Sequence, residues 1–410
     1  MAPCTRRQAI TLGGAAAVLA ACAPDERPGP QPSPATAARP GRLFAETAAG
    51  LAVVDLATGA VRATYPGGVA EPRWARLYQL HDGHLRTYQA GTGTLLDDLA
   101  VGLTNEGPPR IKAVSTGLAA LGPPPGPRTR TTITLAAAGR RRTLHLDGNI
   151  EPEAFSTDGS AMYVLDRLPA SAPDRYRVRV YDLDSGKMGA LQTRDKRQIP
   201  PGQEEEMRGQ GRQAVFDPGQ NILFTLYTHQ DDHLHTRDLK AGRDLNPGVH
   251  AFVHVLHLDQ RWAFCLDLPT PFGLGPAEAH TLALEGQRLY VFDASTGRAV
   301  LASTTDVTIT RSGLAGAPTV AAGEAFSAAG DGRLFLAAGT RLLVSDGATL
   351  ARQAAWDLPG PARGLAYLNG ELLAGAGEQV LRLDPRTGAR LGAVALPGLR
   401  ALRHAEPAAG

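Results

Sequence analysis

The chain has 410 residues, with 42 Lys plus Arg against 40 Asp plus Glu. This balance lacks the basic excess of a nucleic-acid-binding protein, so no nucleic-acid partner is expected. Of the three cysteines, Cys4 and Cys22 lie in the first 22 residues. If both are removed or modified, Cys265 is the one remaining thiol and no internal disulfide can form.

The N-terminus has the parts of a secretory signal. Arg6 and Arg7 precede an apolar stretch over residues 9–21, and small residues lead into Cys22. The apolar stretch is shorter than the roughly 20 residues that span a bilayer. We therefore predict a signal peptide over residues 1–21 and export from the cytoplasm.

Two short motifs refine this prediction. Leu19-Ala20-Ala21-Cys22 resembles the bacterial lipobox, which implies a lipid on Cys22 and a protein anchored to the outer face of the cytoplasmic membrane. The residues around Arg6 and Arg7 resemble the twin-arginine export motif, although Ala9 stands where a large apolar residue is usual. Export through the general secretory route remains the alternative.

Residues 22–42 are predicted to be a disordered linker. This segment contains many prolines among small and polar residues, a composition that cannot bury a core. Its prolines are Pro24, Pro28, Pro30, Pro32, Pro34 and Pro40.

Residues 43–407 are predicted to be all-β, because short apolar runs alternate with turn-forming residues and helical periodicity is almost absent. One pattern recurs: an apolar strand ending in Asp, two free positions, Thr or Ser, Gly, and a second strand. The Asp side chain can accept backbone N–H bonds within such a corner, while Gly takes a positive φ. The clearest copies start at Asp55, Asp182, Asp293 and Asp384.

Weaker copies of the corner occur at Gln89 to Gly93, Leu135 to Gly139, Asp238 to Gly242 and Asp346 to Leu350. A further pair of strands precedes several corners, which gives four strands in each unit. Radial repetition of such units predicts a β-propeller. The two copies near Gln89 and Leu135 could share one blade, so seven and eight blades both remain possible.

The two ends of this domain are candidates to pair with each other. The first unit lacks an opening strand, and a spare apolar segment from Leu399 to His404 follows the last corner. This segment could supply the missing strand and close the ring; the alternative is a frayed tail.

Two strands indicate a family resemblance. Tyr163-Val164-Leu165-Asp166 and Tyr290-Val291-Phe292-Asp293 resemble the Tyr-Val-x-Asn/Asp strand of the YVTN/YncE-like β-propellers. The chain also resembles uncharacterised lipoproteins of high-GC Gram-positive bacteria in its Ala, Gly, Pro and Arg usage. Both likenesses imply a fold and no defined activity.

Histidines cluster in one part of the chain, where their imidazoles could converge on Cu or Zn. Strand histidines that bond to backbone carbonyls explain the same residues, and the spacing matches no standard metal motif. The candidate ligands are His229, His233, His235, His250, His254 and His257, followed in sequence by His280.

Three other features have ordinary structural interpretations. Cys265 lies in an apolar strand and is expected to be inert packing. The run from Glu204 to Glu206 is expected in a solvated loop between blades, with a binding loop as the alternative. The basic run from Arg140 to Arg142 is expected at an exposed strand edge, with contact to anionic lipid or glycan as the alternative.

No nucleophile elbow, zinc-protease pair, phosphate loop or dinucleotide fingerprint occurs, so no catalytic residue or cofactor is assigned. The leading hypothesis is a non-catalytic binding or scaffolding propeller for a protein, peptide or glycan. A metal-binding or redox protein that uses residues 229–257 is the first alternative. A propeller enzyme with its site in the central channel is the second.

Overall fold

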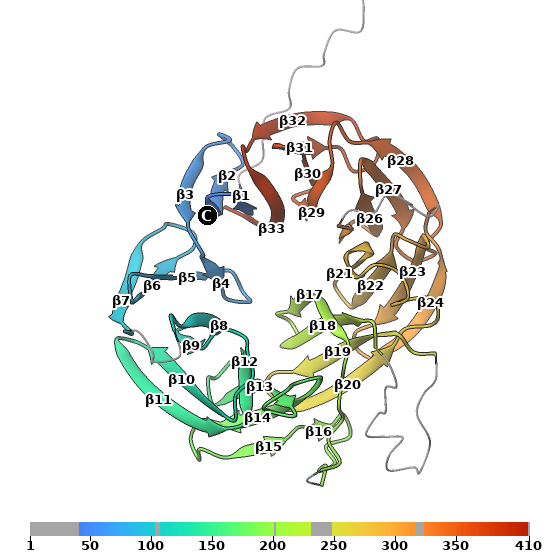
Figure 1. Ribbon diagram of the computed structural model, residues 1–410. Coiled ribbons are helices and arrows are strands. Elements are labelled where there is room, and N and C mark those ends of the chain that lie inside the picture. The colour runs from blue at the N-terminus through green and yellow to red at the C-terminus, as the bar shows by residue number, and fades with distance from the viewer. Residues whose placement is uncertain (1–40, 103–106, 201, 231–247, 317–323, 409–410) are drawn as a thin grey trace, which may run out of the picture. The chain divides into compact units, whose positions relative to one another are not determined.

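The computed structural model describes residues 41–102, 107–200, 202–230, 248–316 and 324–408. The chain divides into two units, Met1–Ala35 and Thr36–Gly410, and every described residue belongs to the second. In this unit eight antiparallel blades surround a central channel, so the protein is an eight-bladed β-propeller (Figure 1). No helix in the described residues is both long enough and apolar enough to cross a membrane.

The first four blades each contain four strands, ordered from the innermost to the outermost. Blade 1 is β33 (Leu399–Pro407), β1 (Gly41–Thr47), β2 (Gly50–Asp55) and β3 (Val61–Tyr65); blade 2 is β4 (Val69–Ala70), β5 (Arg76–His81), β6 (His84–Gln89) and β7 (Leu95–Ala100). Blade 3 is β8 (Arg110–Ser115), β9 (Leu118–Gly122), β10 (Arg130–Ala137) and β11 (Arg140–Asp147); blade 4 is β12 (Asn149–Phe155), β13 (Ala161–Leu168), β14 (Arg175–Asp182) and β15 (Met188–Ala190).

The remaining blades follow the same order, and blade 5 gains a fifth strand at its outer edge. Blade 5 is β17 (Gln210–Asp217), β18 (Ile222–Thr228), β19 (Ala251–His257), β20 (Trp262–Asp267) and β16 (Gln192–Thr193); a 3-10 turn, η1 (Ala277–Ala279), leads to blade 6, which is β21 (His280–Glu285), β22 (Arg288–Asp293), β23 (Arg298–Ser303) and β24 (Thr308–Leu314). Blade 7 is β25 (Phe326–Gly330), β26 (Arg333–Ala338), β27 (Arg341–Asp346) and β28 (Arg352–Asp357); blade 8 is β29 (Ala362–Leu368), β30 (Glu371–Ala376), β31 (Gln379–Leu383) and β32 (Arg390–Ala395).

The recurrent corners have the expected chemistry. In the corner of blade 8, Asp384 Oδ1 accepts the backbone N–H groups of Arg386 and Thr387 at 2.9 and 2.8 Å, and Gly388 has φ +73°. These contacts hold the pKa of the Asp384 carboxyl below its ordinary value, chiefly through the Thr387 N–H. The corner at Asp55 repeats both features, so a sequence of five residues fixes each turn.

The corners also settle the blade count. Those at Gln89 and Leu135 belong to separate blades, 2 and 3, and the count is therefore eight. The Asp293 corner joins the second and third strands of its blade, whereas the other clear copies join the third and fourth. Asp238 lies outside the described residues, between β18 and β19, and the third-to-fourth turn of blade 5 is at Leu258 to Arg261 instead.

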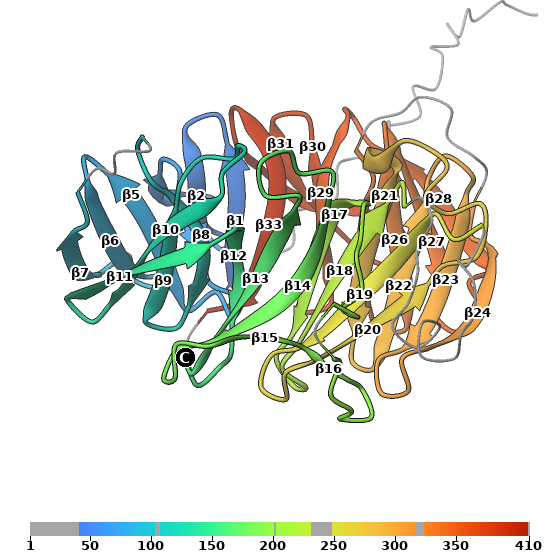
Figure 2. The ribbon, with the colours of Figure 1, turned by 60° about the horizontal axis from the view of Figure 1, so that its bottom comes forward.

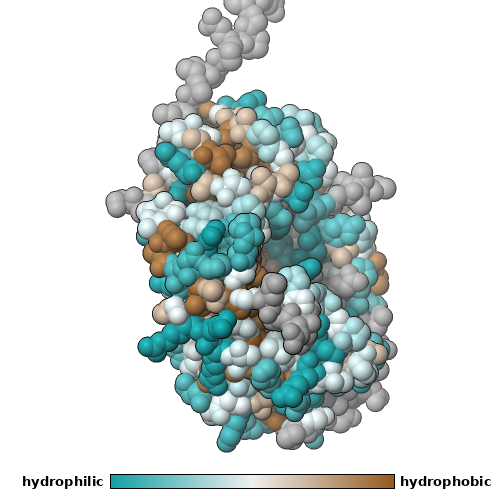
Figure 3. Space-filling view, turned by 60° about the vertical axis from the view of Figure 1, so that its left-hand side comes forward, coloured by the Kyte–Doolittle hydropathy of each residue, from teal (hydrophilic) through white to brown (hydrophobic). Residues whose placement is uncertain are grey.

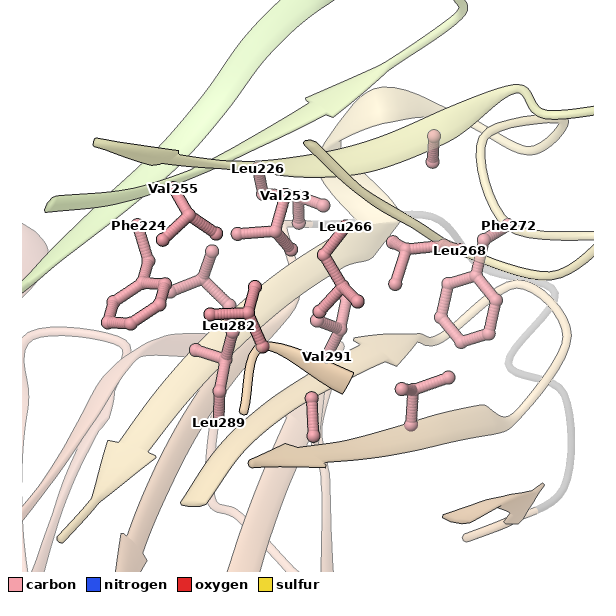
Figure 4. Close-up of a cluster of buried hydrophobic side chains, with 14 of the residues drawn as sticks. Phe224, Leu226, Val253, Val255, Leu266, Leu268, Phe272, Leu282, Leu289 and Val291 are labelled. Carbon is pink, nitrogen blue, oxygen red and sulfur yellow. The ribbon is translucent and has the colours of Figure 1, made fainter. Parts of the chain in front are cut away.

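Apolar side chains between adjacent blades form the core. Between blades 5 and 6, for example, Phe224 and Val255 face Leu282 and Val291, all buried (Figure 4). Burial of each such side chain contributes about 1.5–3 kcal/mol, so the blades are held together mainly by these interfaces.

The C-terminal segment closes the ring, which is one of the two outcomes that the sequence left open. Strand β33 pairs antiparallel with β1, with Leu43 opposite Ala405, and becomes the innermost strand of blade 1. Gly41 and Pro407 are paired, so the first and last strands of the domain meet at one face.

The innermost strands all run in the same direction along the channel (Figure 2). We call the face where they begin the mouth face, and the face where they end the corner face. Six third-to-fourth strand corners with the recurrent motif, including those at Asp55 and Asp384, lie on the corner face.

Candidate functional site

The central channel contains a cavity of about 1080 Å³, to which the innermost strands of all eight blades contribute lining residues. Figure 3 shows the molecule obliquely, with hydrophilic residues around a hollow in its surface. Much of the wall is apolar, and charged side chains interrupt it at definite positions. A preformed cavity with a few placed polar groups is the usual form of a ligand site.

β-bulges place four of these charged side chains. In β8, β12, β17 and β33 the pairing register with the second strand skips one residue, and the skipped residues are Lys112, Glu153, Arg212 and Arg403. All four line the cavity. A bulge turns one side chain out of the regular alternation, so these charges face the channel without disrupting the apolar faces between blades.

Three of the four charges have an ionic partner. Lys112 Nζ lies 2.8 Å from Glu151, Arg212 lies 2.8 Å from Glu324, and Arg403 pairs with Glu46. Glu153 makes no ion pair with a described residue.

Glu153 is the most perturbed carboxyl of the channel. Burial, and then the neighbouring Glu151 carboxylate, raise its pKa from 4.5 to about 7. Its Oε1 atom accepts a long hydrogen bond of 3.5 Å from the Tyr227 hydroxyl, and its buried Oε2 atom has no hydrogen-bond partner. A carboxyl in this state can accept a proton or bind a donor near neutral pH.

A buried donor without a partner lies on the neighbouring blade. The Nε atom of Arg212 makes no hydrogen bond, although its Nη2 atom donates to Glu324. Buried polar atoms are rarely left unpaired in proteins, so these two atoms mark positions along the cavity where water or a ligand can bind.

One side chain crosses the channel near the corner face. The Glu71 carboxylate accepts the backbone N–H groups of Arg73 and Ala75 at 2.9 and 2.6 Å and thereby fixes the turn after β4. From this turn Arg73 Nη2 reaches blade 5, where it donates to Asn221 Oδ1 at 2.7 Å, and its guanidinium lies 5.4 Å from the centre of the Phe216 ring. Arg73 therefore obstructs the channel near its corner face.

Aromatic residues line the wall beside this turn. Trp74 has φ +58° and stacks on His404 with ring centres 4.9 Å apart, and both pack against Phe44. Burial lowers the pKa of His404 to about 4, so this imidazole is neutral at physiological pH. The stack joins blade 2 to the closing strand.

A smaller cavity of about 360 Å³ lies between blades 4 and 5 under the segment that joins them. Cys265 and His254 occupy paired positions on β20 and β19 at its base, and both are buried. Cys265 is thus part of the packed core, as expected.

The described histidines of the cluster do not all point to one place, although His229 and His250 flank the paired residues Thr228 and Ala251. His254 and His257 are three residues apart on β19, so they point to opposite faces of the sheet, and His250 precedes that strand. His229 follows β18 with φ +57° and contacts Thr228. Among the described residues no three His, Cys, Asp or Glu side chains form a metal-binding group.

Other predicted site residues are outside the described part of the chain. His233 and His235 fall in the gap between residues 230 and 248. Arg6, Arg7 and Cys22 precede residue 41. The predictions that rest on them remain predictions.

The expectation of a solvated loop at Glu204 is wrong. This carboxylate is buried and lies 3.3 Å from Arg177 and 3.4 Å from Arg179. The adjoining Met207 is also buried and bonds to the backbone of Tyr176. The segment therefore packs on blade 4. The basic run at Arg140 does begin an outer strand, as predicted, with exposed side chains.

Sequence reasoning missed Glu153, Arg212 and Arg73. The sequence did contain a signal for Glu153, because it follows Pro152 within a strand that otherwise pairs regularly. Proline inside a strand favours a bulge. Arg73 carried no such signal, because its partner Asn221 is 148 positions away.

The fold and channel define an eight-bladed β-propeller with a charged central cavity. No protein-family model matches the chain, and no curated protein matches it. Among solved structures, apo AztD from Citrobacter koseri has a TM-score of 0.56 and 11% identity, covering 92% of this chain and 99% of that chain. This likeness shows the propeller fold alone.

Two other solved structures resemble the chain more weakly. Dihydro-heme d1 dehydrogenase NirN in complex with DHE gives a TM-score of 0.48 at 12% identity, covering 93% of this chain and 78% of that one. BamB from Moraxella catarrhalis gives 0.42 at 12% identity, covering 81% of this chain and 88% of that one.

Proposed function

We propose that this protein is a membrane-anchored extracytoplasmic binding module whose ligand enters the central channel. The observation that carries the proposal is the cavity of about 1080 Å³ with charged residues on four bulges and two unpaired buried polar atoms.

The sequence supports the proposed location. The segment before Cys22 resembles a lipoprotein signal, and the proline-rich residues after it suit a tether. The described domain starts at Gly41 on the corner face, so a tether that joins there leaves the mouth face free. We also propose, on the two Tyr-Val strands, a relation to YVTN/YncE-like lipoproteins of high-GC bacteria.

The anchor can be tested separately from the channel. Cys22→Ser removes the thiol that would carry the lipid, so the protein should move from the membrane fraction to the soluble fraction. Mass spectrometry of the mature N-terminus should find a diacylglyceryl group in the wild type only. An unchanged distribution together with an unmodified N-terminus would refute the anchor.

The binding role is tested by filling the channel. Ala366 lines the cavity, and Ala366→Trp should block it and reduce recovery of the native partner from solubilised membranes. Leu95→Trp is the matched control, because Leu95 is 50% exposed on the outer strand β7. Equal recovery with both variants would contradict channel binding, provided that both melt at the temperature of the wild type.

One observation favours a second candidate, an enzyme with its site in the channel. Glu153 has a pKa of about 7, which suits a general acid or base at neutral pH. Turnover of a bound ligand by the wild type, lost in Glu153→Gln while binding persists, would establish catalysis. Binding without turnover would leave the module non-catalytic.

A further inference from the structure

The mouth of the channel carries arginines that have no ionic partner among the described residues. Arg110 begins β8, Arg208 lies two residues before β17, Arg363 is the second residue of β29 and Arg400 the second of β33. All four side chains are exposed, and none forms an ion pair with another described residue. They come from blades 3, 5, 8 and 1, and so are distributed around the mouth face.

The acidic residues near these positions do not balance them. Glu46, Glu151 and Glu324 are each paired to a bulge cation, namely Arg403, Lys112 and Arg212. Glu278, in η1 before β21, is an exposed carboxylate without a described ionic partner. Glu378, which accepts the N–H of Gly398 just before β33, is a second exposed carboxylate without a described ionic partner. Four unpaired arginines less two unpaired glutamates leave two positive charges near the beginnings of the innermost strands.

Backbone geometry places two of these arginines. In β29 the register skips Arg363 and Gly364, and in β33 it skips Arg400. Gly364 has φ +114°, and a Cβ atom there would lie 2.7 Å from the backbone nitrogen of Leu402 on the closing strand. The close approach of β29 and β33 therefore requires glycine beside Arg363. The bulge that exposes Arg363 is thus part of the ring closure.

Below the mouth the wall carries both apolar and charged side chains. Leu282, Leu365 and Leu402 line the cavity from blades 6, 8 and 1, together with several alanines. The charged bulge residues Lys112, Glu153, Arg212 and Arg403 line the same cavity. A chain with both carboxylate and apolar side chains would satisfy both the arginines and the leucines.

We infer that the mouth of the channel binds an acidic peptide segment whose apolar side chains enter the cavity. This inference rests on the proposed function, since it names the ligand class of the same channel. The exposed arginines attract the peptide over a distance of about 10 Å in dilute salt, and they raise its rate of encounter.

The experiment measures binding of a fluorescent peptide of alternating Glu and Leu to the purified full-length protein. The mouth variant is Arg363→Glu with Arg400→Glu. The control variant is Arg352→Glu with Arg390→Glu, which makes the same change in net charge on exposed, unpaired arginines of the outer strands β28 and β32. The comparison therefore separates local contacts at the mouth from total charge.

We expect the mouth variant to weaken binding of the peptide about tenfold or more, and the control variant to change it less than about twofold. Binding should weaken as salt rises, and should be lost when Gln replaces Glu in the peptide. Equal effects of the two variants, or tighter binding of the anionic glycan heparin than of the peptide, would overturn the inference. Those results would leave channel binding standing, because only the Ala366→Trp comparison tests it.

Discussion

Replacement of Glu153 by glutamine should make the protein more stable above neutral pH. The folded protein holds this carboxyl at a pKa of about 7, against an ordinary value of 4.5, because burial and the Glu151 carboxylate disfavour its charged form. Once both states are ionised, this difference costs folding about 3 kcal/mol. Glutamine has nearly the same shape and no charge.

The sign of the pH dependence follows from the order of proton release. Below pH 4.5 the Glu153 carboxyl keeps its proton in both the folded and the unfolded chain, so the wild type and Glu153→Gln should have similar stability. Between pH 4.5 and about 7 the unfolded chain ionises first, and the wild type loses stability relative to Glu153→Gln.

Thermal unfolding of both proteins from pH 5 to pH 8, followed by circular dichroism, measures this difference. The gap in Tm should open as pH rises and reach its full size near pH 8. A gap that stays constant with pH would refute the assignment of the raised pKa to Glu153. Glu206→Gln is the control, since that carboxylate is exposed and paired with Arg175.

Three further predictions concern the scaffold. Gly388→Ala should lower stability more than Gly139→Ala. Both glycines have φ near +70°, but only a Cβ at Gly388 would lie 2.5 Å from the Trp356 indole. Denaturant unfolding should show an extra loss of about 1–3 kcal/mol for Gly388→Ala, and equal losses for the two variants would contradict the contact. Deletion of residues 399–410 should abolish cooperative unfolding, whereas deletion of residues 408–410 should not, because β33 closes the ring. Cooperative unfolding of the protein that lacks residues 399–410 would show that closure is dispensable. Arg73→Ala should lower stability by about 1 kcal/mol through loss of its bond to Asn221 and its contact with Phe216, and an unchanged melting temperature would show that the crossing contributes nothing.

Local sequence was sufficient to predict the repeating unit. Each corner is a five-residue pattern whose hydrogen bonds lie within the turn, as at Asp384, so nothing distant decides it. The closing strand could be proposed from the sequence but not decided, because an apolar segment without a partner at one end matched a missing strand at the other. The blade count stayed open only because the corners at Gln89 and Leu135 lack the aspartate.

The channel could not be predicted in the same way. Arg73 and Asn221 meet because the ring brings blades 2 and 5 to opposite sides of one space. Glu204 looked like part of a solvated acidic run, but Arg177 and Arg179 on β14 bury it. In both cases the charge is placed by a partner in another part of the chain.

Site-specific photo-crosslinking in the native membrane tests channel binding most directly. A photoreactive amino acid at Ala366 faces the cavity, and one at Leu95 faces outward from blade 2. The account predicts a discrete adduct from Ala366 that is absent from Leu95. An adduct from Leu95 alone, or none from Ala366 in protein that melts like the wild type, would contradict it.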